Sequence, residues 1–131
     1  WVYYSAYDGY HNEQNRTGQL GLVKFGKERF VGIQSDPTGQ LSYVITRPLV
    51  WPGGDLVINA DAAGGSMKVR VTDLDRKVLN GLTWETCVPL KKDAIRHKVT
   101  WEGGTMAGLK GKLVRLEFVF EKADLFAFLA D

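Results

Sequence analysis

This chain of 131 residues is 44% hydrophobic and 24% charged, a composition typical of a single globular domain with one core and not of a disordered chain. Its 17 basic and 15 acidic residues are interspersed and give a net charge of +2, so no basic field indicates a nucleic-acid partner. No apolar run approaches the roughly 18 residues of a membrane-spanning helix, so a membrane is not an expected partner either.

The chain opens with WVYYSAYDGYHNEQNR, in which five of the first ten residues are aromatic and a polar, loop-like run follows. Because it begins at Trp1 inside a strand-like run and without an initiator Met, we expect a truncated or processed piece. Further strand candidates follow in chain order at 18–25, 29–35, 41–46, 55–61, 67–73, 96–101, 113–121 and 124–130.

Alternation with period two assigns one face of several strands to the core. In 113–121, Arg115 and Glu117 point away from that face. The residues expected inside are Met67, Val69, Val71, Val99, Trp101, Val114, Leu116, Phe118, Phe120, Phe126 and Phe128.

Turn signals separate these strands, among them Asp36-Pro37, Pro52-Gly53 and Asn80-Gly81, and fifteen glycines fit many tight turns. No segment holds a helical period of 3.6, and only 105–112 suggests a short helical turn. These features predict an all-β fold, a two-sheet antiparallel β-sandwich of the jelly-roll or lectin-like kind.

Several of these segments together form a familiar pattern. They are Arg29-Phe30-Val31, the segment 47–62 with its WPGG turn and NADA end, Val69-Arg70-Val71, Cys87, 97–104, 109–118 and 123–126. In this pattern, which spans about residues 25 to 129, the chain resembles the C-terminal β-sandwich of bacterial proteins related to the five-bladed propeller glycosidases of the sucrase/levanase and arabinanase type. It departs from the pattern at Trp51 and Phe126, where the family usually has Phe and Tyr.

The resemblance also accounts for the aromatic opening. Residues 1–25 resemble the last strands of the preceding propeller, and we expect them to pack on a sandwich domain of residues 26–131. The resemblance places the catalytic carboxylates of such enzymes on upstream blades, which this sequence does not contain.

No pair of carboxylates is singled out as a glycosidase acid and nucleophile. The candidates Asp8, Asp61, Asp73, Asp75, Asp93 and Asp124 mostly lie beside glycine or in turn-like stretches, where Asp is a common turn former. We therefore expect no catalytic residue and no hydrolysis by this chain alone.

A metal site has little support in the sequence. The two histidines, His11 and His97, and the single cysteine, Cys87, are too scattered for zinc, and we interpret Cys87 as a small buried hydrophobe. A structural Ca²⁺ bound by oxygen ligands is the alternative that we keep open. Its candidate ligands are Asp73, Asp75 and Asp124.

Exposed aromatic rings beside planar polar groups are the residue types that bind sugars, because a ring face packs on the C–H face of a pyranose. Trp51 with Asp55, and Trp84 with Glu85, lie in turn or loop stretches and are the first candidates for a glycan site. Tyr7 and Tyr10 are further candidates.

We therefore expect a non-catalytic accessory module of a carbohydrate-active enzyme, located extracellularly or in the periplasm. It would bind a glycan weakly or brace a glycosidase propeller, so its partners are a glycan or the rest of a multidomain glycosidase-like chain. The alternatives are a purely structural packing domain and a fragment of a glycoside hydrolase, the latter marked by two carboxyl groups in a cleft. A row of exposed aromatic rings on one face would mark a glycan-binding module, and an apolar patch around residues 1 to 10 would mark a bracing module.

Overall fold

A computed structural model describes residues 1–79 and 81–131 of the chain. The described part contains strands and one short 3₁₀ helix, η1, at Ala107–Leu109, within the segment where a helical turn was predicted. Neither η1 nor any other described segment forms a helix with the length and apolarity needed to cross a membrane. The strands are β1 (Val2–Tyr7), β2 (Gly18–Val23), β3 (Ile33–Gln34), β4 (Ser42–Ile45), β5 (Leu49–Val50), β6 (Leu56–Asp61), β7 (Ser66–Thr72), β8 (Asp93–Lys98), β9 (Leu113–Glu121) and β10 (Asp124–Ala130).

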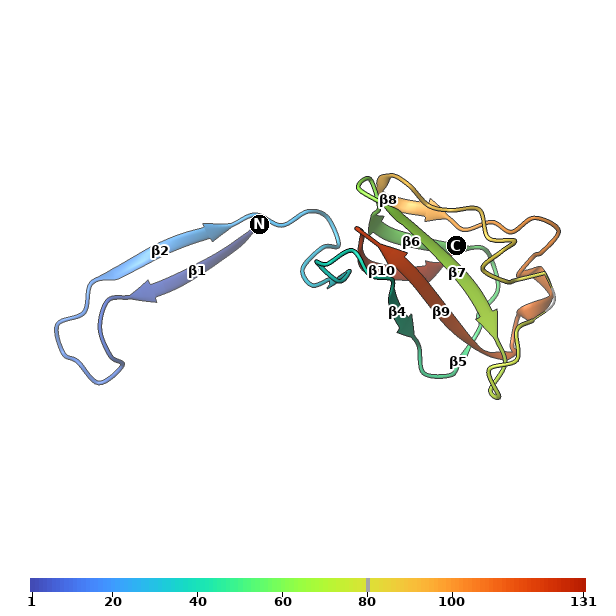
Figure 1. Cartoon of the computed structure of the whole chain (residues 1–131). Helices are drawn as coiled ribbons and strands as arrows, with labels where there is room; N and C mark the ends of the chain where they lie inside the picture. The colour runs from blue at the N-terminus through green and yellow to red at the C-terminus, as the bar shows by residue number, and fades with distance from the viewer. Residues whose placement is uncertain (80) are drawn as a thin grey trace.

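Strands β3 to β10 form two antiparallel sheets that pack together (Figure 1). The first sheet has the order β3-β10-β6-β8. In the second sheet β9 is central, with β7 along one edge and β4 and β5 in succession along the other. The predicted all-β, two-sheet antiparallel sandwich is therefore confirmed.

The core lies between the two sheets and follows the predicted alternation. Phe118 of β9 lies opposite Val44 on one side and Val69 on the other, and all three side chains point toward the first sheet. Trp101 is buried as predicted, and its ring N–H donates a hydrogen bond to the Val69 carbonyl at 2.9 Å. Buried core residues include Leu56, Ile58, Met67, Val69, Val71, Leu116, Phe118, Phe120 and Leu125.

Two predicted strands are shorter or displaced. The segment 29–35 contributes only the two residues of β3. Its first residue closes a turn instead, because the Arg29 N–H donates to the Gly26 carbonyl. The strand expected at 96–101 is instead β8, Asp93–Lys98, and the buried residues Val99 and Trp101 follow its end.

The expectation that Phe126 and Phe128 are both core residues is wrong. A β-bulge between Leu125 and Ala127 shifts the register of β10 against β6, so the alternation of inward positions breaks there. Leu125 is buried, Phe126 is half-buried, and Phe128 is partly exposed while its ring still packs on Phe118.

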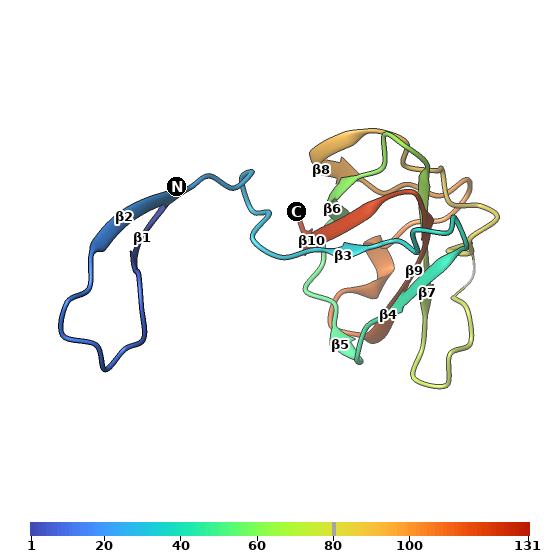
Figure 2. The same ribbon diagram turned by 60° about the vertical axis from the view of Figure 1, so that its left-hand side comes forward.

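Strands β1 and β2 form a separate hairpin, which we call the arm (residues 2–23). Its strands pair with each other over six residue pairs, Val2↔Val23 to Tyr7↔Gly18. Neither strand contacts any strand of the sandwich, and both views show the arm extending away from it (Figures 1 and 2). We expected this segment to pack on the sandwich, whereas the structure holds it apart.

Candidate functional site

The arm presents large apolar and aromatic side chains to solvent along its whole length. Tyr3 and Leu20 are 64% and 78% exposed, and Tyr4, Tyr7 and Leu22 are exposed as well. A two-stranded hairpin is at best marginally stable alone in water, because it has no hydrophobic layer to cover its faces. Contiguous exposed apolar surface of this kind is typical of interaction sites.

The root of the arm is held to the sandwich by a set of contacts that we call the clasp: Arg29, Asn59, Asp93 and Phe126. Asn59 lies on β6 on the outer face of the first sheet and is fully buried, although it is polar. Its side-chain amide donates to the Glu28 carbonyl at 3.2 Å and to the Lys27 carbonyl at 3.4 Å. Each buried polar group of this side chain therefore has a partner in the segment that leads to the arm.

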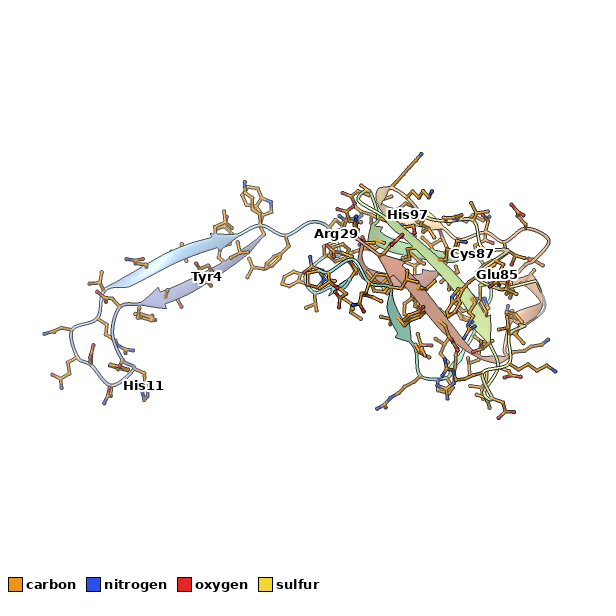
Figure 3. All side chains as sticks on the ribbon, viewed as in Figure 1. Tyr4, His11, Arg29, Glu85, Cys87 and His97 are labelled. Atoms are coloured by element: carbon orange, nitrogen blue, oxygen red, sulfur yellow. The ribbon has the colours of Figure 1, made fainter. Side chains whose placement is uncertain are left out.

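Arg29 completes the clasp from the other side. Its Nε donates to the Asn59 side-chain oxygen at 2.9 Å, its guanidinium pairs with Asp93, and it lies over the Phe126 ring at 4.6 Å. The hydrogen bond from Arg29 holds the pKa of Asp93 below its usual range, although slight burial opposes it. Residues 24–32, between β2 and β3, form the connecting segment from the arm to the sandwich. Figure 3 shows Arg29 where this segment meets the sandwich, with Tyr4 on the arm and His11 at its tip.

An apolar groove of about 460 Å³ opens beside the clasp. It runs between the connecting segment and β10, and its lining includes Val31, Ile33, Val44, Phe126 and Phe128. Just before it, Phe25 and Phe30 stack at 4.2 Å between ring centroids and are both exposed. Apolar surface therefore lies along the arm, at its root and on the neighbouring edge of the sandwich.

We expect that replacing Asn59 with alanine loosens the root of the arm and lowers the free energy of unfolding by about 1–3 kcal/mol. The substitution removes both donors to the carbonyls of Lys27 and Glu28 and the acceptor for Arg29. Hydrogen exchange of residues 24–30 and urea unfolding would measure the two effects. The control is Asp61→Ala on the same strand, and equal effects of the two variants would contradict the clasp.

The sequence reasoning missed the clasp, although one signal for it was present. Strand β6 is buried on both of its faces, and in such a strand a lone Asn needs internal partners. The local sequence does not indicate which segment supplies those partners, because Arg29 and Asn59 are thirty residues apart.

The place of Trp51 beside a turn made it a candidate for an exposed, sugar-stacking ring, but the structure buries it. Its side chain is only 2% exposed and belongs to the core. The ring N–H donates to the Gly54 carbonyl at 3.3 Å, and the backbone N–H donates to the Lys112 carbonyl at 2.9 Å. A ring buried in this way anchors the turn and has no free face for a sugar. Its predicted neighbour Asp55 is exposed and pairs with Lys98.

Trp84 is half-buried on the outer face of the second sheet, and its neighbours hold it there. The Arg70 guanidinium lies over its ring at 3.7 Å, and the Tyr43 ring lies 5.7 Å away in a tilted arrangement. The ring N–H donates to the Glu117 carbonyl at 3.2 Å. These contacts tie the loop after β7 to the central strand.

Glu117 of the central strand β9 lies beneath this loop. Its alternation is as predicted, since it points away from the core, but it is only 1% exposed. Its carboxylate accepts hydrogen bonds from Arg70, Arg76 and Thr72. Burial alone would raise the pKa of Glu117, but the hydrogen bonds from Arg76 and Arg70 hold that pKa below its usual range.

Replacing Trp84 with alanine is expected to lower the free energy of unfolding by about 2 kcal/mol, less than the 3–5 kcal/mol of a fully buried aromatic ring, because part of the ring is exposed. Urea unfolding would measure the loss, and affinity electrophoresis in gels with levan or arabinan would follow retention. Unchanged stability together with lost retention would instead identify Trp84 as a sugar-binding ring. Glu85→Ala beside it is the matched control.

The remaining glycan candidates are scattered. Glu85 is exposed, and its pKa is lowered chiefly by a hydrogen bond from Thr83. Tyr7 and Tyr10 are exposed on the arm, the first at the end of β1 and the second in the loop at its tip. The structure therefore does not bring these residues together with Trp51 or Trp84 into one site.

The three proposed Ca²⁺ ligands do not converge. Asp73 and Asp75 follow Thr72, which lies opposite Arg115, whereas Asp124 follows the other end of β9, where Glu121 lies opposite Ser66. About six residues of extended strand, or roughly 20 Å, separate the two positions. Asp73 caps its own turn by accepting bonds from the backbone N–H groups of Asp75 and Lys77. Among the described residues, no group of three or more His, Cys, Asp or Glu side chains is arranged to hold a metal ion.

The carboxylates of the first sheet form a row across its strands. Asp61 of β6 lies opposite Asp124 on one side and Asp93 on the other. Asp93 is already paired with Arg29, and Asp61 accepts a hydrogen bond from the Ala63 backbone N–H, as a turn former does. Two of these three carboxylates therefore have a structural role, Asp93 in an ion pair and Asp61 in a turn.

Comparison with protein-family models, with curated proteins and with solved structures finds no match for this chain. Its function is therefore inferred from its own residues and geometry.

Proposed function

We propose that this chain is a non-catalytic accessory module of a carbohydrate-active enzyme and that it braces a neighbouring β-propeller of the glycosidase type through its arm. The observation that carries the proposal is the arm itself: a hairpin with exposed apolar residues that contacts no other strand within residues 1–79 and 81–131. The apolar patch around residues 1 to 10 was the feature that separates a bracing module from a glycan-binding one. The sequence pattern of residues 25–129 supports the class of enzyme.

The clasp supports a mechanical role for the arm. Arg29 and Asn59 fix the segment that leads into β2, so the arm leaves the sandwich in a defined direction. Ordering such a segment before contact lowers the entropy that docking would otherwise cost. The groove beside the clasp extends the apolar surface that a neighbouring domain would cover.

Weak glycan binding is the second candidate, and the geometry favours it less. Of its two leading rings, Trp51 is buried and Trp84 has Arg70 over its ring. A fragment that carries out hydrolysis is favoured less still, because Asp93 is engaged by Arg29 and Glu117 by two arginines.

The test uses the intact gene product and the residues encoded before Trp1. We expect repeated four-stranded β units there, and slow amide exchange of β1 and β2 in the intact protein. In the 131-residue chain alone the same amides should exchange rapidly, while the Phe118 amide stays slow in both. Rapid exchange of the arm in the intact product would overturn the proposal.

A further inference from the structure

We infer that the arm is buried on both of its faces by its partner: it enters between two apolar layers as a pair of interior strands and does not lie on a surface. This inference rests on the proposed function and names the manner of contact. The partner is a β-domain with an uncharged, apolar interior and a free strand edge.

Both faces of the arm are mainly apolar and aromatic. The pairing places Val2, Tyr4, Ala6 and Val23 on one face, and the Tyr4 ring covers Gly21 there. The other face carries Tyr3, Tyr7, Leu20 and Leu22, and each face also holds one uncharged polar residue, Gln19 on the first and Ser5 on the second. A strand with one face on a core alternates apolar and polar residues, whereas strands buried on both faces are apolar throughout. The arm is closer to the second pattern, because apolar and aromatic side chains predominate on both faces and neither face carries a charged residue.

The edges of the arm carry none of the features that protect an exposed sheet edge. Neither VYYSAY of β1 nor GQLGLV of β2 contains a charged residue or a proline. Exposed edge strands usually carry such residues, because unpaired backbone N–H and C=O groups otherwise recruit further strands. The uncharged edges of the arm therefore fit backbone pairing with a strand of the partner.

Polarity changes sharply at the tip. The loop 8–17 contains Asp8, His11, Glu13 and Arg16, together with three amide side chains. A paired length of six residues spans about 20 Å. We call the paired strands β1 and β2 the shaft of the arm and the loop 8–17 its tip. A mainly apolar shaft of that length with a charged tip is expected of a hairpin that crosses a buried layer and returns to solvent.

A second copy of the chain fits this surface less well. Two arms that pair edge to edge would leave both faces of the resulting sheet exposed. Two arms that stack face to face would leave the outer face of each exposed. Only a partner that supplies layers on both sides covers Val23 and Leu22 together, and these residues point in opposite directions.

The test compares Val23→Lys with Leu22→Lys in the intact gene product. These are adjacent residues of one strand on opposite faces, and Gln14→Lys in the tip loop is the control. We expect both shaft variants to abolish the slow amide exchange of the arm, whereas the control retains it. In the 131-residue chain the three variants should leave the melting of the sandwich unchanged, which shows that the sandwich itself folds.

The outcomes separate the inference from the proposed function. Loss of protection in only one shaft variant would mean that the arm lies on a surface; this overturns the inference and leaves the bracing role intact. Rapid exchange of the arm even in the unsubstituted intact product would remove the bracing role itself. Sedimentation of the 131-residue chain as a dimer, dissociated by both shaft variants, would identify a second copy as the occupant and overturn the inference.

Discussion

Replacing Phe118 with alanine is expected to lower the free energy of unfolding by about 3–5 kcal/mol, the range measured when a fully buried Phe is truncated. Its side chain is completely inaccessible to solvent and lies on the central strand of the second sheet. It packs on the Phe128 ring of the first sheet, with ring centroids 5.6 Å apart. The substitution therefore removes contacts with both sheets and leaves a cavity between them.

Urea unfolding monitored by tryptophan fluorescence would measure this loss through the shift of the transition midpoint. Val119→Ala is the matched control, because the next residue of β9 points to the outer face and is only half-buried. We expect the control to cost about 1 kcal/mol or less. A loss below about 1 kcal/mol for Phe118→Ala itself would be incompatible with its place in the core.

The long strands could be predicted from the sequence because their alternation is a local property. In β7 and β9 every second residue is apolar, and a shift of one residue would expose the entire apolar set. Burial on one face therefore fixes which residues point inward, and Val69, Leu116 and Phe118 are where the pattern places them.

The residues that sequence reasoning misplaced depend on contacts between distant segments. Trp51 lies beside a Gly-Gly turn, which suggests exposure, yet its backbone bonds to Lys112 and its ring enters the core. Phe126 loses its inward position because of the bulge between Leu125 and Ala127, whereas Phe128 still packs its ring on Phe118. Neither the turn nor the bulge determines by itself whether the ring is buried. Contacts with the opposing strand determine it.

The arm illustrates a different limit. Its two runs of apolar and aromatic residues predict strands, and both strands form. Whether such a hairpin folds back on its own sandwich depends on a complementary apolar surface there. On the outer face of the first sheet, Arg29 and Asn59 make polar contacts that hold the root of the arm.

Replacing Glu117 with alanine is expected to lower the free energy of unfolding by about 3 kcal/mol. Removal of one partner from a buried ion pair typically costs 3–5 kcal/mol, because the other charge stays buried without compensation. Here the lower end of that range applies, since Arg70 and Arg76 both reach solvent and Arg76 is more than half exposed. Thr72 also loses the acceptor of its hydroxyl group.

The same carboxylate should give the stability a defined dependence on pH. The folded-state pKa of Glu117 lies below its usual value, so the unfolded chain binds the proton more readily than the folded one. Its contribution is therefore complete above the usual glutamate pKa of about 4.3 and is lost as the pH falls through the lower folded-state pKa. We expect the stability difference between the unsubstituted chain and the isosteric variant Glu117→Gln to be largest near pH 7 and to shrink toward pH 3. Urea unfolding of both proteins at pH 7, 5, 4 and 3 measures it. A difference that stays constant over that range would mean that the charge of Glu117 contributes nothing and that only its hydrogen bonds and shape hold the loop.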